Sequence, residues 1–164
     1  RGQGGKTVLW DSPLNIHQAG ILARSMAPAP DSLRPAIAPA EALARRVADA
    51  LDYVGVAAME FFAVGGEAVF NEMAPRVHNS GHWTIEGALT SQFENHIRAV
   101  CGLPLGDTKR AAPAVEMDNL IGDEVEAWRG LLADRRAHLH LYGKHHARPG
   151  RKMGHVTRLL ELGD

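Results

Sequence analysis

The sequence has little of three features that define common protein classes: cysteine, long apolar runs and an excess of charge of one sign. Cys101 is the only cysteine, so no intramolecular disulfide can form, which fits a reducing compartment such as the cytoplasm. We expect Cys101 to be buried on an apolar helix face rather than to act as a nucleophile. No run approaches the ~20 apolar residues of a membrane-spanning helix, so we expect no membrane contact.

Charge is nearly balanced, with 18 Lys and Arg against 19 Asp and Glu and a net charge of −1. A general nucleic-acid-binding protein usually carries a broad basic surface, so we expect no nucleic-acid partner. The first residue is Arg1, and no signal-peptide pattern follows it. The chain therefore looks like part of a longer sequence, and its 164 residues suffice for one domain or for two small lobes that share a core.

Apolar periodicity predicts an α+β fold. The glycines of RGQGGKT could belong to a phosphate-binding loop, but the Gly-x4-Gly-Lys-Ser/Thr spacing is absent, so we favour a turn into a strand. The helix at 40–52 is amphipathic, with Leu43, Val47 and Leu51 at four-residue spacing. The predicted strands are 7–10, 21–27, 54–64, 67–73, 114–121, 137–142 and 152–157, and the predicted helices are 40–52, 91–102 and 123–133.

The helix at 91–102 carries a local start signal and an apolar stripe. Ser91 and Glu94 have the spacing of a capping box, in which each side chain bonds the backbone N–H of the other residue. Phe93, Ile97 and Val100 recur at helical spacing. We expect these three side chains to form the buried stripe of the helix.

Two acidic residues belong to a predicted hairpin. Glu60 is the only acid in the nearly unbroken apolar run 54–64, which is typical of a strand covered on both faces. Glu72 ends the return strand, and counting outward from the turn Gly65-Gly66 makes the two acids near cross-strand neighbours. Adjacent carboxylates repel each other unless a cation separates them or one is protonated, and such a pair suits Mg²⁺. The alternative is two strand-end acids, each paired with a basic residue elsewhere.

The loop that follows, within NEMAPRVHNSGHW at 71–83, collects groups that bind anions. Arg76 offers a planar fork matched to carboxylate, bicarbonate or phosphate. His78 and Asn79 add neutral donors, and Gly81 allows close approach of the backbone. The alternative is an ordered loop whose Arg and His bond buried carbonyls, which suits single residues better than the whole set.

A second polar cluster is the histidine-rich and basic segment 138–155. A zinc site is possible because the segment has five histidines, but no Cys or acidic residue stands at ligand spacing. A nucleic-acid surface is disfavoured because the segment is short and the chain nearly neutral. A pocket for a small-molecule phosphate suits Lys144, Arg151 and Lys152, although a solvated basic hairpin explains them equally well.

Several segments together resemble one family, the N5-carboxyaminoimidazole ribonucleotide synthases, which are ATP-grasp ligases of purine biosynthesis. The segments are NIHQAGIL at 15–22, ME-FF at 59–62, NEMAPRVHNSGHWT at 71–84, SQFENHIRAVCGLPLG at 91–106 and YGK-HARPGRKMGH at 142–155. The related formate-dependent glycinamide ribonucleotide transformylases have a similar loop. They continue with Asp-Thr-Gly where this chain has Asn79-Ser80-Gly81, which favours the synthases.

The resemblance implies the C-terminal portion of an ATP-grasp module, an antiparallel sheet with packed helices, at 1–106. It implies a small mixed β/α C-terminal domain, incomplete in length, at 107–164. Enzymes of the family join bicarbonate to 5-aminoimidazole ribonucleotide through carboxyphosphate, with hydrolysis of ATP, and are commonly homodimers. Because the family's glycine loop and lysine contacts to the triphosphate are missing, we expect this chain alone to be inactive.

The resemblance also implies residue roles. Glu60 and Glu72 would hold Mg²⁺; His17, Asn71 and Glu72 would contact ATP; Arg76, His78 and Asn79 would bind bicarbonate as catalytic residues; and Lys144, Arg151 and Lys152 would bind the ribonucleotide. Whether His78 also transfers a proton stays open. The alternatives are another ATP-grasp ligase, such as the transformylase, and a non-catalytic ligand-binding fragment.

Overall fold

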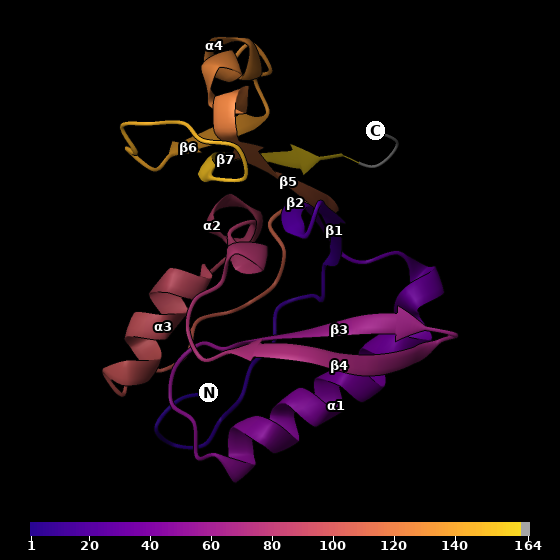
Figure 1. The fold of residues 1–164 in the computed structure, drawn as a ribbon. Helices are drawn as coiled ribbons and strands as arrows, with labels where there is room; N and C mark the ends of the chain where they lie inside the picture. The colour runs from indigo at the N-terminus through magenta and orange to yellow at the C-terminus, as the bar shows by residue number, and fades with distance from the viewer. Residues whose placement is uncertain (162–164) are drawn as a thin grey trace.

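The computed structural model describes residues 1–161 and contains two antiparallel sheets with helices beside them (Figure 1), which confirms the α+β class. The larger sheet has five strands in the order β1-β2-β5-β7-β6, and the smaller is the hairpin β3-β4. The strands are β1 (Leu14–Gln18), β2 (Ile21–Ala27), β3 (Ala58–Val64), β4 (Glu67–Ala74), β5 (Ala114–Ile121), β6 (Ala137–Leu141) and β7 (Lys152–Leu160). The α-helices are α1 (Arg34–Ala50), α2 (Thr84–Gly87), α3 (Gln92–Val100) and α4 (Trp128–Leu131), and the 3₁₀ helices are η1 (Asp31–Leu33), η2 (Asn79–Gly81) and η3 (Gly122–Ala127).

Most strand predictions are confirmed, with β2 and β5 at the predicted bounds and β7 three residues longer than expected. The predicted strand at 7–10 is wrong, because this segment pairs with no strand among residues 1–161 and so lacks the ladder of hydrogen bonds that defines β structure. The strand β1 was not predicted. It lies at the edge of the larger sheet, where one side has no strand neighbour in the described part of the chain and polar residues such as Asn15 and Gln18 are tolerated.

The hairpin β3-β4 lies beside α1, as Figure 1 shows in its lower half. The expectation of a strand at 54–64 covered on both faces is wrong. The strand begins only at Ala58, and Phe62, Val64 and Phe70 are 58%, 60% and 51% exposed. The apolar run predicted the strand correctly but not its cover, because a two-stranded hairpin against one helix buries only part of its surface.

Helix α1 begins at Arg34, six residues before the predicted start. The Pro/Ala-rich sequence before residue 40 predicts a surface connection rather than a helix. Pro35 is nevertheless compatible with the helix, because it lies in the first turn, where a backbone N–H would have no acceptor within the helix. Leu43 and Val47 are half-buried as expected, whereas Leu51 follows the helix and is 61% exposed.

Helix α3 packs through its polar face, which contradicts the predicted apolar stripe. Phe93, Ile97 and Val100 are exposed, and the buried residues of the helix are Gln92, Asn95 and Ala99. The reason is hydrogen bonding: the Asn95 carboxamide accepts from the N–H of Gly106 at 2.8 Å and donates to its carbonyl at 3.3 Å. The cap prediction is confirmed for one of its two bonds, since the Ser91 hydroxyl accepts from the N–H of Glu94 at 3.2 Å. Cys101, expected to be buried, is exposed.

The core lies between the larger sheet and the segment around α2. It is formed by Ala27, Trp83, Ala88, Val115 and Met117. A Cβ at Gly87 would lie 2.7 Å from Val115, so glycine allows α2 to lie close to β5. This packing fixes the end of the polar loop, at Trp83, against the sheet.

The two predicted parts share the larger sheet. Strand β2 pairs with β5, so the sheet takes strands from both sides of the predicted division at residues 106 and 107, which stays a prediction. The last three residues of the predicted C-terminal domain lie outside the described range. Within that range, no helix combines the length and the apolar character needed to cross a membrane.

Candidate functional site

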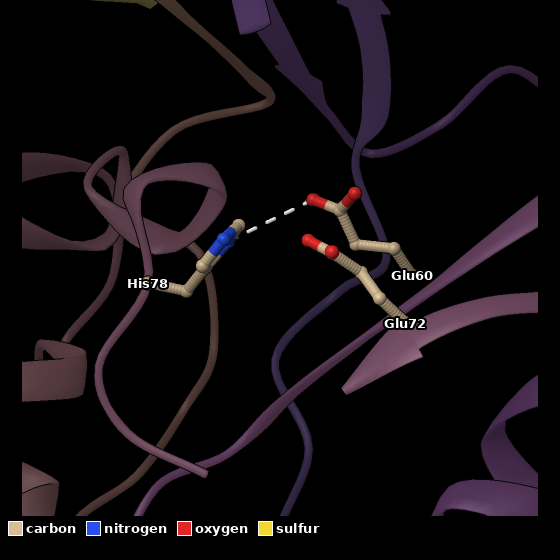
Figure 2. Close-up of side chains that lie close together, drawn as sticks. All are labelled: Glu60, Glu72 and His78. Atoms are coloured by element: carbon tan, nitrogen blue, oxygen red, sulfur yellow. Dashed lines mark ion pairs between the residues drawn. The ribbon is translucent and has the colours of Figure 1, made fainter. Parts of the chain in front are cut away.

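The two hairpin acids are direct cross-strand partners, as predicted. Glu60 on β3 pairs with Glu72 on β4, and a bulge follows Glu60. Figure 2 shows the two carboxylates side by side, facing the ring of His78. The His78 Nδ1 atom lies 3.7 Å from Glu60 Oε1, and one ligand atom from each of the three residues lies within 4.8 Å of the others.

This donor set fits a divalent cation that prefers oxygen. No described residue donates a hydrogen bond to either carboxylate, and Glu72 is exposed, which leaves space for water or phosphate oxygens on the same ion. Mg²⁺ is commonly bound by one or two carboxylates together with such oxygens. Among residues 1–161, only Glu60, Glu72 and His78 converge closely enough to hold one ion.

His78 is half-buried in a defined orientation. Its Nδ1 accepts from the N–H of Ser80 at 3.3 Å and lies 2.8 Å from the Ser80 hydroxyl, so the neutral ring carries its proton on Nε2. Burial lowers the pKa of His78, and the nearby Glu60 carboxylate partly opposes that shift. The ring is therefore neutral near pH 7 and offers a neutral N–H donor.

Gln92, the first residue of α3, holds this loop and was not predicted. Its Oε1 accepts from the N–H of His78 at 2.9 Å, its Nε2 donates to the His78 carbonyl at 2.7 Å, and Nε2 lies 2.9 Å from His82 Nδ1. A Cβ at Gly81 would lie 2.6 Å from Gln92 Oε1. Gly81 thus allows close approach, as expected, but the neighbour it admits is the Gln92 carboxamide.

Asn79 and Arg76 differ in how far the protein already uses their polar atoms. The carboxamides of Asn79 and Asn119 donate to each other at 2.8 and 2.7 Å, and Asn119 also donates to the carbonyl of Leu22 at 2.9 Å. Arg76 is exposed, and its guanidinium donates one hydrogen bond among the described residues, to the carbonyl of Val77 at 3.0 Å. Most of the Arg76 donors are therefore available to an anion.

His17, Glu60 and Asn71 line a common cavity of about 540 Å³. Apolar side chains including Trp10, Ile37 and Phe61 line it as well. His17 lies directly after a bulge in β1, and His17 and Asn71 are exposed. The structure thus places two of the three residues predicted to contact ATP on the same cavity as one of the predicted metal ligands.

The segment 138–155, here called the basic hairpin, carries the three cationic residues predicted to bind the ribonucleotide. Two of them already bond backbone carbonyls of the same segment. Lys144 donates to the carbonyl of Lys152 and lies 5.4 Å from the centre of the Tyr142 ring, and Arg151 donates to the carbonyl of His146 at 3.1 Å. Burial lowers the pKa of Lys152, an effect that Glu60 opposes and Lys144 reinforces. Lys152 therefore connects the hairpin electrostatically with the carboxylate pair.

A cluster of rings behind the loop was not predicted. His155 stacks on His140 with ring centres 4.6 Å apart, lies 5.1 Å from His82, and bonds the Tyr142 hydroxyl through Nδ1 at 2.8 Å. Burial lowers the pKa of His155 to about 3 and that of His82 to about 4. His140 in turn bonds Glu86 at 2.6 Å. The histidine count of the segment was visible in the sequence, but the positions that meet were not.

Two family models match the chain. The ATP-grasp domain matches residues 1–93, and the phosphoribosylaminoimidazole carboxylase C-terminal domain matches residues 116–161. An N5-carboxyaminoimidazole ribonucleotide synthase of Brucella melitensis is 52% identical over 160 residues, which are 97% of this chain and 44% of that protein.

Solved structures agree with these matches. The N5-carboxyaminoimidazole ribonucleotide synthetase of Thermus thermophilus superposes with a TM-score of 0.88 at 53% identity, over 98% of this chain and 44% of that one. The N5-carboxyaminoimidazole synthase of Aspergillus clavatus, in complex with ADP and 5-aminoimidazole ribonucleotide, gives 0.85 at 35% identity, over 92% and 42%. The chain thus spans less than half the length of these relatives. The resemblance seen in the sequence is confirmed, and the chain belongs to the ATP-grasp family.

Proposed function

We propose that this chain is part of a ligase that carboxylates 5-aminoimidazole ribonucleotide with bicarbonate and ATP, giving N5-carboxyaminoimidazole ribonucleotide, ADP and phosphate. The observation that carries the proposal is the Glu60–Glu72 pair opposite His78, in the same loop as Arg76. The names of the relatives support the substrate class.

Bicarbonate is a poor electrophile until a phosphoryl group turns one oxygen into a leaving group, as in carboxyphosphate. Mg²⁺, when bound, would offset the negative charge on the phosphate oxygens during phosphoryl transfer. Glu60 and Glu72 hold the ion on adjacent strands, so the hairpin ladder fixes their separation. His17 and Asn71, on the same cavity as Glu60, contact the nucleotide.

The loop binds the one-carbon anion. Arg76 presents parallel N–H groups to two of its oxygens, and neutral His78 donates from Nε2. Holding the anion in line with the phosphoryl group removes much of the orientational cost of the encounter. Lys144, Arg151 and Lys152 form a basic surface for the ribonucleotide phosphate. The cytoplasmic location and the homodimer stay predictions.

The test is a chimera in which this chain replaces the aligned segment of the Brucella melitensis relative, of which it covers 44%. We expect ADP release that depends on both bicarbonate and 5-aminoimidazole ribonucleotide. ADP release that depends instead on formate and glycinamide ribonucleotide would favour the transformylase activity. A folded chimera without either activity, beside an active Brucella parent, would favour a non-catalytic ligand-binding role and refute the proposal.

A further inference from the structure

The carboxamide of Gln92 joins two histidines of the polar loop. Gln92 is 3% exposed, and its side chain bonds the backbone of His78 twice and the ring of His82 once. The N–H of Gln92 donates to the Thr84 hydroxyl at 3.0 Å, and that hydroxyl donates to the carbonyl of Gly81 at 2.6 Å. The carboxamide is therefore held both by the start of α3 and by the loop that it bonds.

The backbone of His78 determines which end of the carboxamide is the oxygen. An N–H can only donate, so the atom that accepts from the His78 N–H at 2.9 Å is the Gln92 oxygen. A carbonyl can only accept, so the atom 2.7 Å from the His78 carbonyl is the Gln92 nitrogen. His78 has extended backbone, with φ −131° and ψ 153°, and the carboxamide pairs with it as a neighbouring strand would. This pairing uses one hydrogen of the Gln92 NH₂.

The other hydrogen of the Gln92 NH₂ determines the tautomer of His82. An amide NH₂ only donates, so the His82 Nδ1 atom, 2.9 Å away, accepts and carries no proton. Burial lowers the pKa of His82 to about 4, so the ring is neutral near pH 7 and its single proton is on Nε2. His78 has the same tautomer for another reason, because its Nδ1 accepts from the N–H of Ser80.

The Nε2–H group of His82 is available to a ligand. It bonds no described residue, and it is not one of the enclosed atoms without a partner in the described part of the chain, as Nε2 of His155 is. The ring of His82 lies edge-on to that of Tyr142, with centres 6.3 Å apart. Lys144 Nζ lies 5.4 Å from the centre of the same Tyr142 ring. His82 therefore adjoins the basic hairpin, which carries the residues predicted to bind the ribonucleotide.

We propose that His82 donates a hydrogen bond from Nε2 to an acceptor oxygen of the ribonucleotide, and that Gln92 is the positioning residue that gives His82 this tautomer. The inference rests on the proposed function, because it adds a contact to the substrate of that reaction. The basic hairpin already supplies positive charge, and a neutral N–H adds direction to it. The same carboxamide also holds the backbone of His78, so one buried side chain supports contacts to both substrates.

The first test measures the tautomer and needs no activity. In the 164-residue chain, NMR of the ring nitrogens, assigned by their loss in His82→Gln, should show a protonated Nε2 and an unprotonated Nδ1 for His82 at pH 7. Gln92→Glu places an acceptor beside His82 Nδ1, so this atom should gain a proton. The control Gln18→Met removes an exposed carboxamide of β1 and should leave the parent tautomer.

A protonated Nδ1 in the parent would refute the inference, and this measurement decides even if Gln92→Glu does not fold. The parent tautomer retained in a folded Gln92→Glu would refute the positioning role of Gln92. Neither result depends on the activity of the chimera, so failure of the inference is separate from failure of the proposed function.

The second test identifies the ligand of His82 in the active chimera, with two substitutions of similar length. His82→Met removes the donor and should raise the KM for the ribonucleotide about two- to tenfold, the range for a single hydrogen bond, with the KM for ATP unchanged. His82→Gln keeps an N–H near the position of Nε2 and should recover part of this loss. The control His138→Met alters an exposed histidine of β6 and should change neither KM.

An unchanged KM for the ribonucleotide in His82→Met would refute the contact. An increase confined to bicarbonate would refute the assignment of His82 to the ribonucleotide. Equal losses in His82→Met and His82→Gln would show that the shape of the ring matters and not its N–H, which would refute the donor role.

Discussion

The free energy of unfolding should fall more steeply with decreasing pH than the loss of ion pairs alone explains. The reason is that the folded chain shields two histidine rings, those of His155 and His82, from water. His155 is 1% exposed and His82 is half-buried, and burial lowers their pKa values from 6.5 to about 3 and about 4. Between these values and 6.5, each histidine is protonated in the unfolded chain and neutral in the folded one. The unfolded state thus binds more protons, so the free energy of unfolding falls as the pH falls through this window.

The magnitude follows from the linkage relation. Each histidine contributes a slope of about 1.4 kcal/mol per pH unit. The two together contribute about 2.7 kcal/mol per unit while both are protonated in the unfolded chain and neutral in the folded one. Lowering the pH from 6.5 to 4.5 should therefore remove up to about 5 kcal/mol. A domain is typically stable by about 5–15 kcal/mol, so the loss is a large part of the total. The slope from the two rings should be about half its full value at pH 6.5, where the unfolded histidines are half protonated, and should be nearly gone by about pH 7.5.

Urea titrations at pH 7.5, 6.5, 5.5 and 4.5, followed by tryptophan fluorescence, measure this dependence. His155→Gln should lower stability at neutral pH but reduce the slope below pH 6.5 by about 1.4 kcal/mol per unit. The matched control His138→Gln removes an exposed histidine of the neighbouring strand and should keep the parent slope. A parent slope in His155→Gln would refute the assignment of the acid sensitivity to this ring.

Four further changes test the site. Glu72→Gln should weaken Mg²⁺ binding roughly tenfold or more, because one of two charged oxygen ligands is lost; unchanged affinity by calorimetry would exclude this residue as a ligand. Arg76→Lys should raise the KM of the chimera for bicarbonate about ten- to a hundredfold, since an ammonium cannot make two parallel bonds, and an effect on ATP alone would assign Arg76 to the nucleotide. Lys144→Ala should raise the KM for the ribonucleotide by a similar factor, less at high salt; wild-type affinity in a binding titration, with and without a chelator, would exclude the phosphate pocket. Gly81→Ala should displace the Gln92 carboxamide and destabilise the fold by about 1–3 kcal/mol, and an unchanged urea midpoint would contradict this contact.

The carboxylate pair could be predicted from the sequence because its geometry is local. A tight turn fixes the register of a hairpin, and register fixes which side chains are neighbours. Counting outward from Gly65-Gly66 therefore placed Glu60 beside Glu72, even though a bulge follows Glu60. The residue types of the loop also indicated anion binding. In the structure, the Arg76 guanidinium donates to the carbonyl of Val77 and keeps its other donors for such a ligand among the described residues.

The supports of the site could not be predicted, because they come from distant segments. Gln92 lies 14 residues from His78, and Asn119 lies 40 residues from Asn79. Carboxamides are common on surfaces, and nothing local separates one that bonds a loop backbone from one that bonds water. The same limitation reversed the faces of α3, where periodicity favoured burial of Phe93 but amide bonds made the polar face the buried one.

The pairing of β2 with β5 has a consequence for how this part of the protein can be divided. The ATP-grasp match ends at residue 93 and the second match begins at 116, yet the larger sheet takes neighbouring strands from each. Cutting the chain between the two matches would leave each piece with an open row of backbone N–H and C=O groups, the kind of edge that recruits another strand. The two matched regions are therefore separate units of sequence that share one sheet, and we expect an exchange of modules between relatives to keep that sheet closed only when it carries both strands together.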